Sequence, residues 1–420
     1  MTFEKLGDIA LVTPGTSPKG TLINSTRIGL PFFQGSKEFK ELYPAPERYT
    51  KHPVKVAKSG DVLISVRAPV GEVNIAREDC AIGRGVMSVR AKKESEQLFI
   101  FYFLKNLKGK WDSLGSTGSV FENLSTVALN NVNIPVGLNR EAIGEILFNI
   151  DKKIEANNDL SKTLEDIAQK IFKSWFIDFE PVKAKMAGKK PAGMDDATAA
   201  LFPDSMEESE LGMIPRDWKW KTIGDIASVI DCLHSKKPEL LTKGFPYLQL
   251  DTISNRGVLR YENAGLISKE DYEKWTSRIE VRGGDCLITN VGRVGAVSQV
   301  PNHFKAAIGR NITALRPINS ELHQSFLIVA LLSSFMKMEI LRNTDSGTIL
   351  EALNVKNIPR LRVPGPPSEL LLKFARICDP IQSQIQELHA MNVNLARIRD
   401  SLLPRLISGE LQIPEELLAS

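Results

Sequence analysis

Apolar side chains recur at alternating spacings of four and three residues in two separate stretches of the chain. The first stretch runs from Ile143 to Trp175 and the second from Phe374 to Leu402. A repeat of 3.5 residues that is kept over several heptads predicts helices that pair as a coiled coil, not a solitary amphipathic helix. Both stretches also place an asparagine near the middle of the apolar seam.

The ends of these helices are predicted from prolines and polar residues. The first helix is expected over residues 140–178. The second is expected to begin near Pro380, because proline fits the first turn of a helix and removes a hydrogen bond elsewhere. By the same reasoning Pro404 predicts its end, which gives a second helix over residues 380–403.

The remaining sequence predicts two strand-rich domains. Short β-branched runs such as Val62 to Val66 are bounded by glycine and proline, which is typical of strands. Each half has one helical stretch, over residues 95–108 and 321–342, and ends in an extended segment. The fold class that follows is α+β, with two repeated strand-rich domains separated by two long helices that form a coiled coil.

The two domains repeat one another about 220 to 230 residues apart. Five short segments recur in the same order: Leu6–Ala10 with Ile223–Ala227, Pro31–Gln34 with Pro246–Gln249, Ser59–Ser65 with Gly283–Thr289, Ala81–Arg84 with Ala307–Arg310, and Thr117–Glu122 with Ser346–Glu351. A period of this length indicates a duplicated domain and not a solenoid. A duplicated domain in turn suggests a bipartite ligand.

These patterns divide the chain into six parts. We expect domain one at 1–138, the first spacer helix at 139–180, a linker at 181–211, domain two at 212–366, the second spacer helix at 367–410 and a tail at 411–420. The linker assignment follows from three prolines and an acidic run, Glu207-Glu208-Ser209-Glu210.

Both repeats carry a net positive charge, and the rest of the chain carries a net negative charge. Residues 1–138 hold 18 Lys and Arg against 13 Asp and Glu, and residues 212–366 hold 21 against 15, while the rest holds 15 against 22. A basic domain favours a polyanionic partner, because counterion release from phosphates provides most non-specific affinity for nucleic acid. Ordinary surface scatter is the alternative, and finding the excess in both copies weakens it.

Sequence motifs of catalysis and metal binding are not found. The chain lacks a glycine-rich phosphate loop, a nucleophile elbow and the Asn/Asp-Pro-Pro-aromatic loop that adenine methyltransferases share. The four cysteines form no C-x-x-C pair and the five histidines show no metal-ligand spacing, so we expect buried, reduced thiols and no metal. With no apolar run long enough to span a membrane and no signal peptide, the cytoplasm is the expected location.

Two arginines are the strongest candidates for DNA contact. Arg84 and Arg310 follow the same Ala-Ile-Gly tripeptide in the two copies. Arginine can bond guanine O6 and N7 in bidentate fashion or clamp a phosphate. An ion pair within each domain is an equally weighted alternative.

Further candidates lie at matched strand ends. Gln34 and Gln249 suit adenine, although a strand-end glutamine that caps backbone is as plausible. The segments after the Ser59 and Gly283 repeats differ between copies, as expected if each copy reads a different sequence, and plain loop variability is the alternative. The candidates from these segments, with the residue after Arg310, are Ser65, Arg67, Thr289, Asn290, Arg293 and Asn311.

The chain resembles the specificity subunits of type I restriction–modification enzymes over nearly its whole length. The resemblance rests on Phe172-Lys173-Ser174-Trp175-Phe176-Ile177-Asp178-Phe179-Glu180-Pro181-Val182 after the first helix, and on Leu403-Pro404-Arg405-Leu406-Ile407-Ser408-Gly409-Glu410-Leu411 after the second. It also rests on Leu211-Gly212-Met213-Ile214-Pro215 leading to Trp218 and Gly224-Asp225-Ile226.

This resemblance implies a non-catalytic subunit that reads a bipartite, asymmetric DNA site and directs adenine methylation or restriction by its partners. The implied partners are double-stranded DNA, two modification subunits and restriction–translocase subunits, which would hold AdoMet, ATP and Mg²⁺. It also implies antiparallel pairing of the two helices, so Asn157 and Asn392 should meet and set their register. A self-contained DNA methyltransferase or nuclease is the alternative function.

Overall fold

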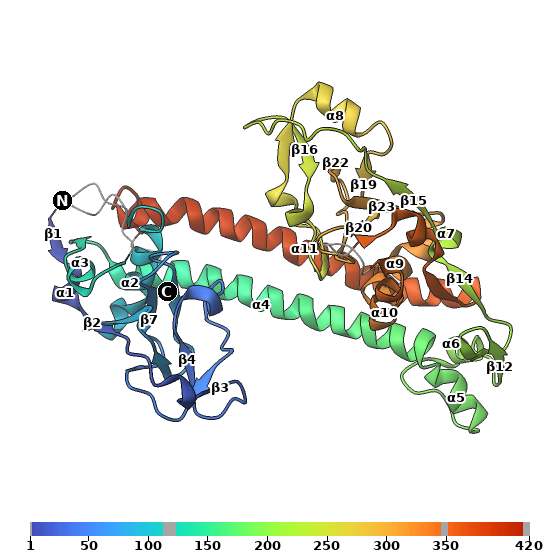
Figure 1. Cartoon of the computed structure of the whole chain (residues 1–420), viewed down its shortest axis with the longest axis horizontal. Helices are drawn as coiled ribbons and strands as arrows, with labels where there is room; N and C mark the ends of the chain where they lie inside the picture. The colour runs from blue at the N-terminus through green and yellow to red at the C-terminus, as the bar shows by residue number, and fades with distance from the viewer. Residues whose placement is uncertain (1, 112–122, 346–351, 415–420) are drawn as a thin grey trace. The chain divides into compact units, whose positions relative to one another are not determined.

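The computed structural model describes residues 2–111, 123–345 and 352–414 (Figure 1). The chain forms two compact units, which are described separately below. The first unit is Met1–Ala156 with Asn394–Ser420, and the second is Asn157–Val393. Each unit therefore combines one repeat with one segment of each long helix. The repeated segments Thr117–Glu122 and Ser346–Glu351 lie outside the described residues.

Two sheets and a strand pair form the β-structure of the first unit. A four-stranded sheet has the order β2-β10-β7-β8 and a five-stranded sheet the order β3-β5-β4-β9-β6. The strands are β2 (Ala10–Pro14), β10 (Val86–Ala91), β7 (Val62–Ser65), β8 (Val73–Ile75), β3 (Ile23–Asn24), β5 (Tyr49–Thr50), β4 (Leu30–Phe33), β9 (Cys80–Ile82) and β6 (Val56–Ala57), with β1 (Phe3–Lys5) paired to β11 (Asn133–Pro135).

The second unit repeats this plan. Its main sheets have the orders β15-β23-β20-β21-β17 and β18-β16-β22-β19. The strands are β15 (Ala227–Asp231), β23 (Ile312–Pro317), β20 (Cys286–Thr289), β21 (Val297–Gln299), β17 (Gly257–Val258), β18 (Gly265–Ile267), β16 (Phe245–Leu248), β22 (Lys305–Ile308) and β19 (Val281–Arg282); three pairs are β14 (Lys219–Thr222) with β26 (Arg362–Gly365), β12 (Met206–Ser209) with β13 (Gly212–Pro215), and β24 (Thr344–Asp345) with β25 (Ala352–Leu353).

Strand register shows that the two copies correspond residue by residue. Strand β2 pairs with β10 so that Pro14 faces Met87, and β15 pairs with β23 so that Asp231 faces Thr313. In the second sheet of each copy, β4 runs parallel to β9 and β16 runs parallel to β22. The duplication inferred from the sequence is therefore confirmed at the level of strand pairing.

The repeated Gly-Asp-x-Leu-Ile segment is explained by a partly buried ion pair in which the aspartate is the buried member. Asp61 receives two hydrogen bonds from Arg90, at 2.7 and 2.9 Å, and Asp285 receives the same two from Arg316, at 2.8 and 2.6 Å. Both aspartates are buried. A bidentate pair of this kind joins neighbouring strands, so this part of the repeat serves the scaffold.

Helices cover the sheets largely as the sequence predicts. Helix α2 (Gln97–Asn106) lies within the expected stretch 95–108, whereas the stretch 321–342 is two helices, α9 (Ser320–Leu332) and α10 (Ser334–Arg342). The break occurs because the Ser333 hydroxyl accepts the Met336 N–H and caps the second helix. The shorter helices are α1 (Leu6–Ile9), α3 (Thr126–Asn130), α7 (Ile223–Ile226) and α8 (Lys269–Trp275), and 3₁₀ turns cover Gly20–Leu22, Ser36–Glu38, Glu94–Glu96, Leu250–Thr252, Tyr261–Asn263 and Val355–Arg360.

In the described ranges, no single helix combines the length and apolar character that crossing a membrane requires. The bent pair α9 and α10 passes that test together, by length and composition only. Most of α9 is buried in the core of the second unit, where Phe326 and Leu327 pack beneath the sheet.

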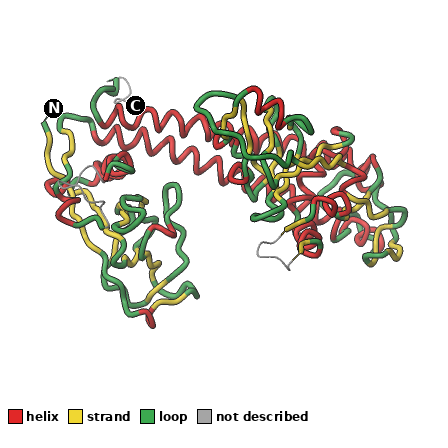
Figure 2. Tube along the Cα trace, turned by 45° about the horizontal axis from the view of Figure 1, so that its top comes forward, coloured by secondary structure: helices red, strands yellow, loops and turns green. Residues whose placement is uncertain are grey.

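The two long helices are α4 (Arg140–Phe172), followed by a π-helical turn at Lys173–Ile177, and α11 (Ser368–Ile407) (Figure 2). The prediction that the second helix begins at Pro380 is wrong, because α11 starts twelve residues earlier. A proline inside a helix costs roughly 3 kcal/mol. Burial of Leu370, Phe374 and Cys378 in the core of the second unit offsets that cost.

In each unit the segments of α4 and α11 run antiparallel. In the first unit Ile143 and Leu147 share a core with Leu403 and Leu406, and in the second Ala168 and Phe172 share one with residues from Leu370 to Cys378. No residue of the two predicted seams is exposed. Within each unit this packing is consistent with the expected coiled coil.

Asn157 and Asn392 meet as predicted. The Asn157 Nδ2 donates to Asn392 Oδ1 at 2.8 Å, and Asn392 Nδ2 donates to Asn158 Oδ1 at 2.9 Å. Asn157 is buried. The pair forms only in one register of the two helices, because a shift by one turn separates the amides.

Replacing Asn157 alone by Leu should destabilise this helix pair by about 1 kcal/mol, because the half-buried Asn392 Oδ1 loses its donor while Asn392 Nδ2 keeps its bond to Asn158. Replacing both asparagines by Leu should restore or slightly raise stability, since two apolar side chains fill the seam without a desolvation cost. Urea unfolding of the full chain measures both variants. A double variant as unstable as the single one would contradict this account.

The segment expected as a linker is structured and packs on the second unit. It contains helices α5 (Glu180–Met186) and α6 (Asp196–Ala200) and strand β12. Val182 and Phe202 are buried in the same core as Trp175, Phe176 and Trp218. The ring of Trp175 lies 5.5 Å from Phe202 in an edge-to-face arrangement, which stabilises the junction between α4 and the second repeat.

Candidate nucleic-acid interface

The same exposed turn carries the candidate arginine in each domain. In the first domain Gly83, Arg84 and Gly85 join β9 to β10, and in the second Gly309, Arg310 and Asn311 join β22 to β23. Arg84 and Arg310 are exposed, and neither side chain has a hydrogen bond or ion pair with the residues that the structure describes. The alternative of an ion pair inside each domain is therefore not what these side chains form.

Backbone crowding explains the residues that flank the arginines. A Cβ atom at Gly85 would lie 2.0 Å from the carbonyl oxygen of Gln34, so only glycine fits there. Asn311 takes the equivalent place with φ of +67°, a left-handed conformation that asparagine tolerates better than most residues. Asn311 thus shapes the turn, and its half-buried side chain remains a candidate contact.

The two glutamines lie beside these turns. The Gly83 N–H donates to Phe33 at 2.8 Å and the Gly309 N–H donates to Leu248 at 2.8 Å, so Gln34 and Gln249 are the next residues along each paired strand. Gln34 is exposed and its Oε1 accepts from Arg48 at 3.2 Å. Gln249 is half-buried, and its carbonyl oxygen accepts from Thr252. The amide of Gln34 is therefore the more accessible of the two.

Ser65 and Thr289 do not belong to the contact surface, contrary to the prediction. Both are buried, and both hydroxyls make the same two bonds. Each donates to the carbonyl oxygen four residues ahead, in Pro69 or Arg293, and each accepts the N–H seven residues ahead, in Glu72 or Ala296. They hold the loop that follows each strand, which explains why a hydroxyl recurs in both copies.

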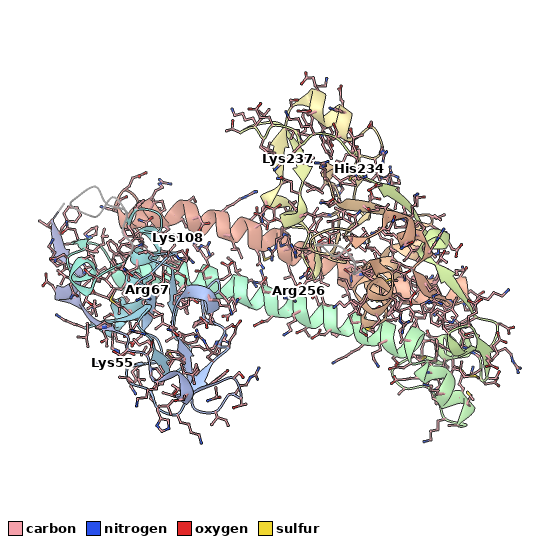
Figure 3. All side chains as sticks on the ribbon, in the orientation of Figure 1. Lys55, Arg67, Lys108, His234, Lys237 and Arg256 are labelled. Atoms are coloured by element: carbon pink, nitrogen blue, oxygen red, sulfur yellow. The ribbon has the colours of Figure 1, made fainter. Side chains whose placement is uncertain are left out.

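The other loop candidates divide by accessibility. Arg67 is exposed, with no side-chain partner among the described residues, and remains a candidate (Figure 3). Arg293 is exposed but its guanidinium bonds Leu250, Ile253 and Asn255 at 3.0–3.3 Å, so it braces a neighbouring loop. Asn290 is buried with its Oδ1 unbonded, and its backbone bonds Asn311 and Leu353. Neither residue presents its polar group to a ligand in this arrangement.

Structure adds residues that sequence reasoning missed. In the first domain Ser17 Oγ accepts the Arg84 N–H at 3.2 Å, and His234 is the residue of the second domain that lies equally far along the chain from the matched strand ends Pro14 and Asp231. Exposed lysines without a partner in the described ranges include Lys55 in the first unit and Lys237 in the second, both shown in Figure 3. The sequence signal for Ser17 and His234 is their matched position, which is recognised only when β2 and β15 are aligned residue by residue.

These features define a two-domain recognition protein in which each copy presents, on one common scaffold, an exposed arginine that has no side-chain partner among the described residues. Residues 1–166 and 215–391 match the family model of the type I restriction modification DNA specificity domain. Because the match covers most of the chain, the protein belongs to this family.

Two relatives in sequence are named as specificity subunits of type I restriction enzymes. The MjaIX specificity subunit of a type I restriction enzyme from Methanocaldococcus jannaschii is 26% identical over 435 residues, covering 98% of this chain and 94% of the relative. A putative MjaX specificity subunit from the same organism is 40% identical over 160 residues, which is 37% of each chain.

A solved structure shares the fold. The crystal structure of a type I restriction–modification S subunit from M. genitalium covers 96% of this chain and 95% of its own, with a TM-score of 0.57 and 18% identity. The likeness extends over both repeats and both long helices, in agreement with the predicted fold class.

Proposed function

We propose that this chain is the DNA-recognition subunit of a type I restriction–modification complex and that each repeat reads one half of a bipartite, asymmetric target. The observation that carries the proposal is that Arg84 and Arg310 are exposed on equivalent turns, with no side-chain partner in the part of the chain that the structure describes. A scaffold that keeps its buried ion pairs and varies its loops suits two separate readings of sequence. The net positive charge of both repeats also favours DNA as the ligand.

Methylation and cleavage are assigned to partner subunits in this proposal. The relatives are named as specificity subunits, which supports association with modification and restriction subunits that would hold AdoMet, ATP and Mg²⁺. The experiment is methylome sequencing of a host that expresses this chain with its modification partner. A bipartite methylated motif supports the proposal, and methyl transfer by the purified chain alone would favour a self-contained methyltransferase.

Arg84→Ala and Arg310→Ala should each weaken binding of the cognate duplex by about 1–3 kcal/mol, or roughly 5- to 150-fold in Kd, if the arginine contacts a base edge. Such a variant relaxes one position of one half-site. An arginine that holds phosphate instead weakens all sequences alike and lowers the salt dependence of binding. Duplex titrations at several salt concentrations distinguish the two roles.

Two controls accompany this measurement. Arg216→Ala removes another exposed arginine from the second unit, in the turn between β13 and β14, and should leave affinity unchanged. Thermal unfolding should show that Arg84→Ala and Arg310→Ala fold like the parent chain. Unchanged affinity together with a lowered melting temperature would show that the arginines serve the scaffold.

A further inference from the structure

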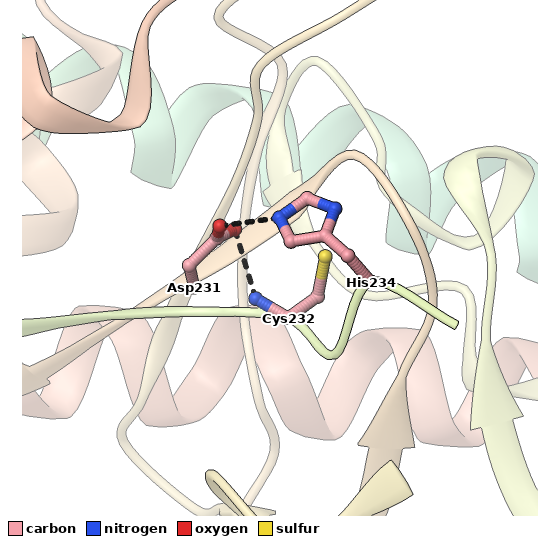
Figure 4. Close-up of side chains that lie close together, drawn as sticks. All are labelled: Asp231, Cys232 and His234. Carbon is pink, nitrogen blue, oxygen red and sulfur yellow. Dashed lines mark hydrogen bonds and ion pairs between the residues drawn. The ribbon is translucent and has the colours of Figure 1, made fainter.

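Three different metal-binding side chains meet at the end of β15. The Asp231 carboxylate, the Cys232 thiol and the His234 imidazole each offer one ligand atom within 4.8 Å of the other two (Figure 4). Asp231 Oδ2 lies 2.7 Å from His234 Nε2, and Asp231 Oδ1 accepts the Cys232 N–H at 2.9 Å. Cys232 is 1% exposed, whereas the His234 side chain is 56% exposed, so the cluster opens to solvent on one side.

The scaffold does not require this trio for folding. Strand register makes Pro14, Gly15 and Ser17 the equivalents in the first domain, and none of them is a metal ligand of this kind. In the first domain a Cβ atom at Gly15 would lie 2.3 Å from the carbonyl oxygen of Gly83, so no side chain fits there. The second domain has opened this position to admit a thiol, which points to a role that the first domain lacks.

The sulfur atom is the buried member of the trio, because Cys232 is almost fully shielded from solvent. Among the described cysteines, which are all free and buried, only Cys232 joins such a cluster.

We propose that Asp231, Cys232 and His234 bind one divalent transition-metal ion of the zinc class, with solvent completing a tetrahedral site. Nitrogen, sulfur and oxygen donors together match Zn²⁺ and Co²⁺, whereas Mg²⁺ and Ca²⁺ select oxygen ligands alone. The present hydrogen bond between Asp231 and His234 would open to about 3.3 Å around the ion, given zinc–ligand distances of roughly 2.0–2.2 Å.

A metal ion here would cross-link the loop that leaves β15. This loop continues through the exposed residues Lys236 and Lys237 and returns at β16, beside the Arg310 turn. The guanidinium of Arg278 already holds the Cys232 carbonyl oxygen at 3.0 Å, so one side of the loop is fixed. Metal binding would fix the other side of this loop. The first domain, which lacks the three ligands, would have no such cross-link. The site is proposed independently of DNA binding, and its test needs no DNA.

Cobalt(II) is the probe, because a thiolate–cobalt bond gives a charge-transfer absorption that oxygen and nitrogen ligands do not. The full chain, stripped of metal with a chelator that is then removed, should bind one equivalent of Co²⁺ with this absorption, and Zn²⁺ should displace it. Cys232→Gly and His234→Ser install the residues of the first domain and should each weaken Co²⁺ binding at least about a hundredfold. Binding should also release a proton near neutral pH, because the thiol must ionise.

His303→Ser, which removes an exposed histidine from the same domain, should leave the cobalt absorption unchanged. The metal-free melting temperature of His234→Ser should match that of the parent chain, whereas Cys232→Gly should melt lower, because it removes a buried side chain. If Cys232→Gly fails to fold, His234→Ser alone decides the question, because it alters only an exposed side chain. The proposal is overturned if the parent chain shows no saturable thiolate absorption at one equivalent, or if the absorption persists in the folded variants.

Discussion

Asp151→Ala is expected to destabilise the first unit by about 3–5 kcal/mol, the largest single effect on stability that we predict. Asp151 is buried on α4 and bonds three side chains: the Tyr102 hydroxyl at 2.7 Å, Lys105 at 3.5 Å and the Arg399 guanidinium. Arg399 comes from α11, so this carboxylate joins the C-terminal segment of the chain to the first repeat.

The loss of stability in Asp151→Ala arises because two cations, Arg399 and Lys105, lose the carboxylate that neutralises them. Burial alone would lower the pKa of Arg399, but Asp151 and, to a smaller extent, Asp400 together outweigh it, so the pKa is raised. Burial does lower the pKa of Lys105, which Asp151 opposes. Without the carboxylate, Arg399 remains charged and buried, and among the described residues Asp400 is its one remaining ion-pair partner. An uncompensated buried charge is far more costly than a missing surface pair.

Urea unfolding of the full chain measures this effect, and hydrogen exchange should show faster opening of residues 394–407. Glu47→Ala, which breaks the exposed pair with Lys37, is the control and should leave stability unchanged. Replacing Asp151 and Arg399 together by Leu and Met should recover much of the loss, because an apolar pair carries no desolvation cost. Equal stability of Asp151→Ala and the parent chain would contradict the network.

Exchange of residues 1–138 for the corresponding domain of a relative is expected to replace one half of the recognised sequence and leave the other half unaltered. The reason is that each repeat has its own sheets, its own buried Asp–Arg pair and its own arginine turn. Recognition residues on separate scaffolds act independently when neither scaffold contributes to the core of the other.

The structure adds a condition to this exchange. The core of the first repeat includes Ile143 and Leu147 from α4 and Leu403, Leu406 and Ile407 from α11. A donor domain must therefore pack against these helix residues, or they must be transferred with it. The reciprocal exchange of residues 212–366 is the control and should change the opposite half-site. Methylome sequencing reads both results, and a change in both half-sites after one exchange would refute independent reading.

Sequence alone determined the duplication, the fold class and the two helix seams. These follow from local regularities: a 3.5-residue apolar repeat positions a coiled coil, and matched segments in one order indicate equivalent domains. The pairing of Asn157 with Asn392 also followed, since polar residues in the middle of two antiparallel seams must meet. The missing catalytic motifs excluded several classes of enzyme, and the resemblance to a family then indicated the function.

Tertiary structure decided which side chains are available. Ser65 and Thr289 look like polar loop residues in the sequence, but their hydroxyls bond backbone four and seven residues ahead and are buried. Arg293 and Arg310 are both exposed, yet only Arg310 keeps a guanidinium without a partner in the described residues. Hydrogen-bond partners of this kind depend on how a loop returns to the sheet, which spacing does not encode.

The same reasoning applies to the helix start and to the cysteine. Pro380 predicts a helix beginning because proline lacks an N–H, but burial of Phe374 and Cys378 against the second repeat extends α11 to Ser368. Cys232 shows no metal spacing in the sequence, since Asp231 and Cys232 are adjacent. A turn after β15 brings both beside His234, so their proximity is a product of the fold.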